Sequence, residues 1–260
     1  MASFSKYTMS TAPTWISFPK PNPNAALRLF CFPYAGIGSN IYYNWANSLP
    51  DHVELCLVHL PGRERRLKEP PFNCMSKLVE ALDRPLLPYL DRPVAFWGHS
   101  MGGLISFELA RHYRRAYGLR AAQLFISAFG APPRLCLPAS VQNQQPVDFL
   151  HEVQSLNQVT RLTADSMPLL KLMLPALKAD LALCATYSYQ AEAPLDCAIT
   201  ALGGLDDHQV KCEDLEAWRE ETTGRFALRM FRGDHFFIHT AESLVLQALS
   251  EELIQLAKTA

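Results

Sequence analysis

Residues 98–103 form the segment that most constrains the fold, and they read Gly-His-Ser-Met-Gly-Gly. The segment directly follows the apolar run 94–97 and directly precedes the helix-like stretch 104–110. A strand that turns at once into a helix through the pattern G-x-S-x-G holds its serine in a strained backbone conformation and lifts the hydroxyl above the sheet edge. The pattern therefore predicts a strand, a tight turn and a helix, with Ser100 as a candidate nucleophile. A plain glycine-rich turn is the alternative.

A nucleophilic serine needs a base and an acid that orients the base, and residues of both kinds follow two later strand-like runs. Asp206 and Asp207 come shortly after the run 198–202, and His235 comes shortly after the run 226–231. In an open α/β sheet, functional groups gather at the carboxyl ends of the strands. We therefore expect His235 and one of the aspartates to meet the serine, although the three lie far apart in the sequence.

The chemistry gives each of these groups a role. His235 would take the proton of the Ser100 hydroxyl during attack on a carbonyl and return it to the leaving group. A buried aspartate would hold the imidazole in the right tautomer and stabilise the imidazolium. Turn geometry favours Asp207, three residues beyond Gly204, and Asp206 is the alternative.

The tetrahedral intermediate of such a reaction needs two backbone N–H donors. One donor should be the amide of Met101, directly after the candidate nucleophile, and the other should come from the loop after an early strand. Residues 27–32 have the composition of that strand, and residues 33–38 form that loop.

Apolar runs alternate with helix-like stretches along the chain, which is the pattern of a mainly parallel sheet covered by helices on both faces. The expected strands are residues 27–32, 53–59, 94–97, 123–127, 198–202 and 226–231. The expected helices are residues 40–48, 75–90, 101–117, 211–222 and 239–258. Pro85 and Pro88 should kink or divide the second helix, and roughly the first twenty residues should form an extended arm.

A long insertion, at about residues 132–194, separates the fourth and fifth expected strands and is far longer than a crossover requires. Its stretch 167–181 is apolar on more than one face. One interpretation is an extra helical layer of the core. The other, which we favour, is a lid over the serine that shapes an acyl pocket and excludes water. The candidate pocket residues are Met167, Met173 and Leu174, with core packing as their alternative role.

Composition predicts one domain over residues 1–260, because 49% of the residues are hydrophobic and suffice for a sizeable core. The 24 lysines and arginines nearly balance 25 aspartates and glutamates, and the net charge of −1 argues against a nucleic-acid partner. Residues 1–15 lack the apolar core of a secretory signal, and no stretch approaches the roughly 18 apolar residues of a membrane span. Seven cysteines without C-x-x-C spacing are typical of reduced thiols, so we expect a cytoplasmic protein without membrane contact.

Two groups of arginines and two histidines have more than one interpretation. Arg111, Arg114, Arg115 and Arg120 lie toward the end of the helix after the serine, where a solvated helix end is favoured over a docking surface for an acidic partner. Arg63 and Arg65 follow a Pro-Gly turn, where a surface salt bridge is favoured over loop support or a phosphate contact. His99 is expected to pack, and His239 is expected near a helix start rather than in a metal site.

Five motifs occur in order across most of the chain, and their combination resembles a known family. They are Phe32-Pro33-Tyr34-Ala35-Gly36, Leu60-Pro61-Gly62-Arg63-Glu64-Arg65, residues 98–103, the turn from Gly203 to Asp207, and Gly233-Asp234-His235-Phe236-Phe237. The chain resembles the type II thioesterases that serve polyketide synthases and nonribosomal peptide synthetases, within the α/β-hydrolase superfamily. The resemblance implies the α/β class and the α/β-hydrolase fold, a mostly parallel central sheet flanked by helices, with a helical lid insertion.

By this resemblance Ser100, Asp207 and His235 form the catalytic triad, and the amides of Ala35 and Met101 form the oxyanion hole. The substrate-binding candidates are then Tyr34, Met167, Met173, Leu174 and Phe236. In many relatives a proline follows the acid, whereas His208 follows it here, so Asp206 stays open as the alternative.

The activity implied by the resemblance is that of a serine thioesterase, which hydrolyses acyl or aminoacyl groups from the phosphopantetheine thiol of carrier proteins. Its role would be to edit misprimed or stalled synthases. Phosphopantetheine would arrive with the substrate, so neither a bound cofactor nor a metal is expected. The expected partner is an acyl or peptidyl carrier protein, met transiently by a monomer. The alternatives are an acyl-CoA thioesterase or general carboxylesterase acting on free small molecules and, less favoured, a non-catalytic binding relative.

Overall fold

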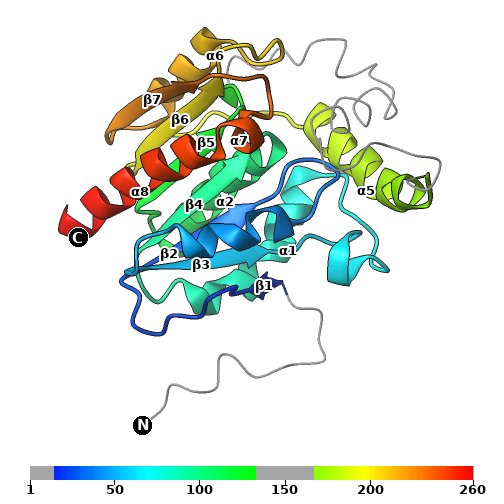
Figure 1. Cartoon of the computed structure of the whole chain (residues 1–260), viewed down its shortest axis with the longest axis horizontal. Helices are drawn as coiled ribbons and strands as arrows, with labels where there is room; N and C mark the ends of the chain where they lie inside the picture. Colours follow the sequence, from blue (N-terminus) through cyan, green and yellow to red (C-terminus); the bar gives the residue numbers. More distant parts are fainter. Residues whose placement is uncertain (1–14, 133–166, 260) are drawn as a thin grey trace.

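A computed structural model describes residues 15–132 and 167–259, which form a seven-stranded sheet of order β1-β3-β2-β4-β5-β6-β7 (Figure 1). Strands β2 to β7 are parallel to their neighbours, and β1 is antiparallel to β3. The strands are β1 (Ile16–Ser17), β2 (Leu27–Phe32), β3 (Val53–Val58), β4 (Val94–His99), β5 (Gln123–Ser127), β6 (Ala198–Gly204) and β7 (Phe226–Phe231). The mainly parallel sheet predicted from the alternating pattern is thus present.

The predicted strands differ slightly from those in the structure, both in where a strand ends and in one additional strand. Strand β4 continues to His99, because His99 still pairs with Ser127 of β5. Strand β1 was not predicted, since the arm that contains it was expected only to be extended. Ile16 pairs there with Val58, so the last part of the arm adds an antiparallel strand to the sheet edge.

The core lies on both faces of the four strands β2, β3, β4 and β5, in which every residue is buried. Strands covered on both faces need largely apolar sequences rather than alternation, and these four strands are largely apolar, with buried polar residues such as Arg28 and Glu54 near their starts. Aromatic rings fill one part of this core, where Trp97 lies 5.0 Å from Trp45 and 6.4 Å from Phe125 between ring centroids. Strand β7, at the edge, is only partly buried.

The helical segments include both α-helices and 3-10 helices. The α-helices are α1 (Met75–Leu86), α2 (Met101–Tyr117), α5 (Met167–Ala185), α6 (Cys212–Glu216), α7 (Phe237–Thr240) and α8 (Glu242–Thr259). The 3-10 helices are η2 (Ser39–Asn47), η3 (Glu64–Arg66), η4 (Leu87–Tyr89) and η7 (Ala217–Glu221). The predicted helix 75–90 ends as an α-helix at Leu86 and continues as η4, which agrees with the division expected from Pro85 and Pro88.

Helices cover both faces of the sheet because the strand order changes direction. The crossover from β2 to β3 runs one way along the sheet, and those leading to β4 and β5 run the other way, so right-handed connections place their helices on opposite faces. Helix α8 crosses the near face in Figure 1, beside η2, where the Trp45 indole donates a hydrogen bond to Glu242 at 3.4 Å. On the other face α1 and α2 pack together, and the Tyr113 hydroxyl donates to the Asp83 carbonyl at 3.0 Å.

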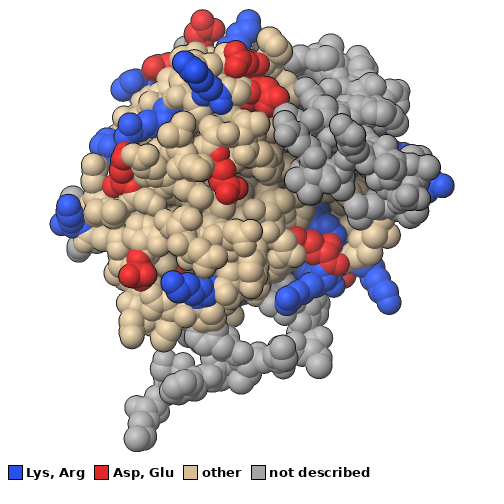
Figure 2. Space-filling model, in the orientation of Figure 1, with Lys and Arg blue, Asp and Glu red and all other residues tan. Residues whose placement is uncertain are grey.

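Helix α5 is the described helix of the insertion predicted at residues 132–194, and it lies beyond one end of the sheet (Figure 1). Residues 133–166 lie outside the described residues, so the lid stays a prediction. No helix within the two described ranges is long and apolar enough to span a bilayer. On the face shown in Figure 2, basic and acidic side chains are interspersed rather than gathered by sign.

Candidate functional site

Ser100 lies at a sharp turn between the end of β4 and the start of α2. Its backbone has φ 51° and ψ −122°, a conformation that residues other than glycine rarely adopt. The turn requires glycine at Gly98, where a Cβ atom would lie 2.0 Å from the backbone of Gly102. The amide of Gly103 donates to the Ser100 carbonyl at 2.8 Å and closes the turn. The predicted strand, turn and helix are therefore all present.

Asp207 and His235 form a buried pair at the carboxyl ends of β6 and β7. The Nδ1 atom of His235 lies 2.8 Å from Oδ2 of Asp207, and their side chains are 6% and 1% exposed. The other carboxylate oxygen accepts the amides of Gln209 at 2.7 Å and Val210 at 3.1 Å. These contacts fix the carboxylate and orient the imidazole. The structure therefore pairs the imidazole with Asp207, whereas Asp206 is exposed.

The two loops that carry this pair are joined through their backbones. The amide of Leu205 donates to the Phe231 carbonyl at 2.8 Å, and the amide of Asp206 donates to the Gly233 carbonyl at 2.9 Å. Gly204 permits this approach, since a Cβ atom there would lie 2.2 Å from the carbonyl oxygen of Asp234. The glycine turn seen in the sequence thus brings the acid and the imidazole together.

The imidazole of His235 packs against that of His99, which ends β4 and directly precedes Ser100. The two imidazole centroids are 5.4 Å apart. Among the described residues, Nε2 of His235 is buried and has no hydrogen-bond partner. Nδ1 of His99 is hydrogen-bonded to the Ser127 hydroxyl at 2.8 Å, and burial, with smaller effects from His235 and His239, holds the pKa of His99 well below its usual value. His99 is therefore a neutral packing residue, as predicted.

The loop after β2 packs directly on the start of α2. A Cβ atom at Gly102 would lie 2.4 Å from the carbonyl oxygen of Phe32 and 2.9 Å from that of Pro33. Ala35, in this loop, and Met101, the first residue of α2, are both buried. The first amides of a helix have no partner within the helix, so the Met101 amide is a donor of the kind the chemistry needs.

The substrate-binding candidates lie in two different environments. Tyr34 and Phe236 are buried and pack edge to face at 5.2 Å between ring centroids. The Tyr34 hydroxyl and Nε2 of His239 are hydrogen-bonded at 3.0 Å, and His239 lies in the short helix α7, in agreement with the prediction of a helical position. Met173 and Leu174 are half-buried on α5. The side chain of Met167 lies outside the described part of the chain.

Arg63 makes a buried contact that agrees with loop support, the less favoured of its two interpretations. A surface salt bridge was favoured, but Arg63 and Asp180 of α5 are 6% and 3% exposed and only 2.6 Å apart. The pair lies beside the loop that contains Ala35. The one sequence signal for it is that Asp180 is the single acidic residue of the otherwise largely apolar helix α5.

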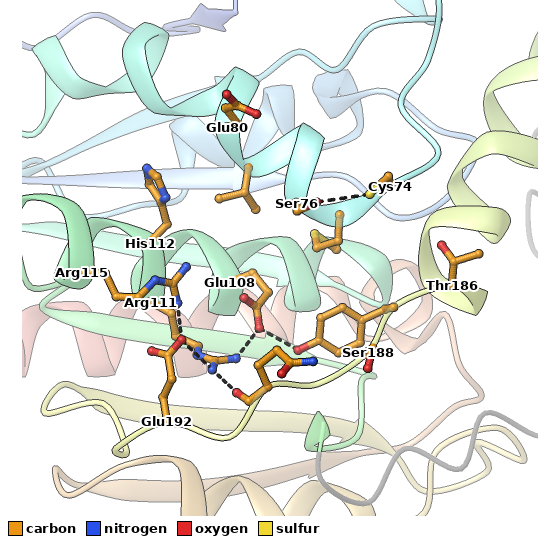
Figure 3. Close-up of a pocket in the computed structure, with 14 residues that line it drawn as sticks. Cys74, Ser76, Glu80, Glu108, Arg111, His112, Arg115, Thr186, Ser188 and Glu192 are labelled. Atoms are coloured by element: carbon orange, nitrogen blue, oxygen red, sulfur yellow. Dashed lines mark hydrogen bonds and ion pairs between the residues drawn. The ribbon is translucent and has the colours of Figure 1, made fainter.

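The arginines of α2 are paired rather than free. Arg111 is buried and donates to Glu108 at 2.6 Å and to the carbonyl of Gln190, while Arg114 and Arg115 pair with Glu192. All of these residues except Arg114 line a cavity of about 510 Å³ between α1, α2 and residues 186–192 (Figure 3). Of the two interpretations, neither a solvated end nor a free basic surface describes Arg111, because its charge is used to hold the segment that follows α5.

Within residues 15–132 and 167–259, no group of three or more histidine, cysteine, aspartate or glutamate side chains is arranged to hold a metal ion.

Known proteins are similar to this chain in both sequence and fold. Residues 27–253 match the family model of the thioesterase domain. Over 239 residues the chain is 37% identical to the gramicidin S biosynthesis protein GrsT of Aneurinibacillus migulanus, covering 92% of this chain and 93% of that protein. It is 32% identical over 241 residues to thioesterase PikA5 of Streptomyces venezuelae, covering 92% of this chain and 85% of the relative.

A solved structure is also similar along nearly the whole length. The type II thioesterase BorB from the borrelidin biosynthetic cluster superposes with a TM-score of 0.83 and 32% identity, covering 94% of this chain and 100% of BorB. The predicted α/β-hydrolase fold is confirmed by this match together with the parallel sheet. The chain therefore belongs to the thioesterase family, whose members hydrolyse thioester bonds, and its relatives include type II thioesterases of polyketide and nonribosomal peptide pathways.

Proposed function

We propose that this chain is a serine thioesterase that removes acyl groups from the phosphopantetheine thiol of carrier proteins, with Ser100, His235 and Asp207 as its triad. One observation carries the assignment of residues. The buried His235–Asp207 pair lies beside the strained turn of Ser100, and Nε2 of His235 has no hydrogen-bond partner in the part of the chain that the structure describes. This is the arrangement in which an imidazole activates a serine hydroxyl.

The reaction would proceed through an acyl-enzyme. The Ser100 oxygen attacks the thioester carbonyl, and Nε2 of His235 takes the hydroxyl proton. The amides of Ala35 and Met101 stabilise the oxyanion. The carbon–sulfur bond then breaks, and His235 gives the proton to the departing thiol. A water molecule, deprotonated by His235, attacks the acyl-enzyme; the carbon–oxygen bond to Ser100 breaks, and the serine regains its proton.

The carrier protein as substrate is supported by relatives such as GrsT and BorB, whose names place them in biosynthetic pathways or clusters. We propose that the chain edits stalled or misprimed synthases, meeting each carrier protein transiently as a monomer. Because phosphopantetheine would arrive with the substrate, the reaction needs no resident cofactor. A cytoplasmic setting is supported by six described cysteines, all of them free thiols.

The substrate proposal is tested by presenting one acyl group in three forms: on a carrier protein, on coenzyme A and as an oxygen ester. We expect the highest kcat/KM with the carrier-bound thioester. Ser100→Ala should lower turnover of every form by at least about 10³-fold, since the nucleophile is removed. Equal or better turnover of the free esters would instead identify a general hydrolase, and full activity of Ser100→Ala would exclude the serine mechanism.

The assignment of the acid has a matched control in the next residue. Asp207→Asn should lower kcat by about 10⁴-fold while keeping the fold, because the amide favours the wrong imidazole tautomer. Asp206→Asn, one position earlier and exposed, should leave kcat within about twofold of wild type. Equal losses in the two variants would show that Asp207 has no special role.

A further inference from the structure

Arg63 and Asp180 form a two-pronged ion pair that lies away from water. Nη1 of Arg63 donates to Oδ2 of Asp180 at 2.6 Å, and Nη2 donates to Oδ1 at 2.8 Å. Two parallel hydrogen bonds between a guanidinium and a carboxylate fix both groups in direction as well as distance. Arg63 belongs to the turn after β3, whereas Asp180 belongs to α5, so the pair joins the insertion to the body of the domain.

The same pair holds the backbone that follows Ala35. Oδ2 of Asp180 accepts the amide of Gly36 at 2.7 Å, and Nη1 of Arg63 donates to the carbonyl of Ile37 at 3.3 Å. Gly36 has φ 77°, and a Cβ atom there would lie 3.0 Å from Leu177 of α5. The carboxylate of Asp180 therefore holds the loop at Gly36, and Leu177 of α5 lies close to the same residue.

Fixing Gly36 constrains the amide that the proposed mechanism uses. The peptide bond between Ala35 and Gly36 is planar, so a hydrogen bond from the Gly36 amide also sets the direction of the Ala35 carbonyl. Only the two backbone torsions of Ala35 then separate this fixed plane from the Ala35 N–H. An oxyanion donor acts only when it is aimed in advance at the position where negative charge develops.

Stability alone gives a weak reason for this ion pair. Buried ion pairs are often no more stabilising than apolar side chains of similar size, and removing one partner leaves an unpaired charge. The structure offers a comparison, because Arg28 and Glu54 form another buried pair at 2.7 Å. That pair joins the starts of β2 and β3, at the opposite end of the strands from Ser100, and does not touch the loop that contains Ala35.

We propose that Arg63 and Asp180 are positioning residues for the oxyanion hole: they aim the Ala35 amide, so the hole is complete only when α5 is docked against the loop. This inference rests on the proposed function, in which Ala35 is an oxyanion donor. It adds a role for α5, which supplies one of the groups that hold the catalytic loop in place.

The test measures kcat and KM for Asp180→Leu and Asp180→Asn on whichever thioester the wild type turns over. Loss of an oxyanion donor lowers kcat by about 10²- to 10³-fold, and we expect Asp180→Leu to approach this range. Asp180→Asn keeps an oxygen that can accept the Gly36 amide, so its loss should be smaller. KM should change less than about threefold in both, because a donor aimed at the transition state contributes little to substrate binding.

Glu54→Gln is the matched control, since it removes the charge from a buried pair far from the loop. It should lower stability in urea as Asp180→Asn does, yet keep kcat within about twofold of wild type. A further readout is affinity for a trifluoromethyl ketone analogue, which adds reversibly to the serine and places an oxyanion in the hole. Its affinity should fall in parallel with kcat in the Asp180 variants.

The positioning role is overturned if folded Asp180→Leu keeps kcat within about twofold of wild type, or if its loss lies wholly in KM. This failure is distinct from failure of the proposed function. If Ser100→Ala stays active, the serine mechanism is wrong whatever the Asp180 variants do. If carrier-bound thioesters are poor substrates, only the substrate proposal fails, and the variants can be compared on the substrate that is used.

Discussion

Gly102, at the start of α2, lies close to the backbone where β2 ends and the loop that contains Ala35 begins. A methyl group there would lie 2.4 Å from the carbonyl oxygen of Phe32, which ends a central strand and cannot move freely. We expect Gly102→Ala to push the loop aside. A displacement of about 1 Å can cost about 10²-fold in rate, so kcat for thioester hydrolysis should fall at least tenfold. Overpacking should also cost about 1–3 kcal/mol in urea unfolding.

The other end of α2 provides a control for this substitution. Gly118 has φ 64°, and no atom of residues 15–132 or 167–259 lies within 4 Å of its Cβ position, so alanine there meets only the backbone strain. Gly118→Ala should cost a comparable 1–2 kcal/mol, roughly the penalty of the left-handed conformation, while leaving kcat unchanged. A similar fall of kcat in both variants would mean that general destabilisation, and not loop displacement, lowers activity.

At the residue scale, contacts between residues close in the sequence were easier to predict than contacts between residues far apart in the sequence. The turn around Gly204 and the aspartates after it are visible locally, and the structure places Asp207 against His235 as expected. The pairing of Arg63 with Asp180 spans 117 positions, and nothing in the residues near Arg63 signals a buried partner. The sequence therefore favoured a surface salt bridge, which was wrong.

Helix α2 has a second structural role besides carrying the serine at its start. In its middle, Arg111 holds residues 186–192 through the carbonyl of Gln190 and through Glu192, and it pairs with Glu108 (Figure 3). The side chain of Arg111 is 3% exposed, whereas that of Arg115, on the same helix and bound to the same Glu192, is 47% exposed. Two arginines with a shared partner thus differ in burial and in the number of groups that they bind.

The contrast predicts unequal losses of stability. Arg111→Met should lower the free energy of unfolding by about 3 kcal/mol, because it removes a buried guanidinium that bonds to Glu108, Glu192 and the Gln190 carbonyl. Arg115→Met should lower it by less than about 1 kcal/mol, as is usual for an exposed pair. Urea denaturation of the two variants beside wild type measures both values. Equal losses would show that burial of Arg111 does not strengthen its pairing.

Among the elements, the type of each was easier to predict than its ends. The run 239–258 was predicted as one helix, but the structure has α7 and α8, because the chain ends a short helix at Thr240 before continuing. The run 211–222 is likewise divided into α6 and η7, and 40–48 is a 3-10 helix. Hydrophobic periodicity marks a helical face, whereas local backbone hydrogen bonds decide where one helix ends and the next begins.

At the scale of the whole molecule, buried histidines couple folding to pH. Burial lowers the pKa of His99 well below its usual value, and it also lowers the pKa of His239. In the unfolded chain both would titrate near pH 6.5. Below that pH the unfolded state binds more protons than the folded state, so stability must fall as the pH falls.

We expect the free energy of unfolding to drop between pH 7.5 and 5.5, with about 1 kcal/mol of the loss due to His99. His99→Gln, which keeps a side chain able to reach the Ser127 hydroxyl, should reduce this slope. Urea unfolding at several pH values measures it. Glu221, whose pKa burial raises, opposes the trend near its lower end and is present in both proteins. An unchanged slope in His99→Gln would mean that His99 does not remain neutral in the folded state.

The sequence by itself determined the sheet class, the turn at Ser100 and the two loops that carry Asp207 and His235. Each of these depends on neighbouring residues: apolar runs, glycines where the backbone approaches closely, and polar residues just after a strand. The tertiary structure alone decided which aspartate faces the imidazole and which residue of α5 holds the loop after β2. The first choice depends on which aspartate is buried against His235. The second depends on a contact between Arg63 and Asp180, which lie 117 positions apart in the sequence and pair only because folding brings them together.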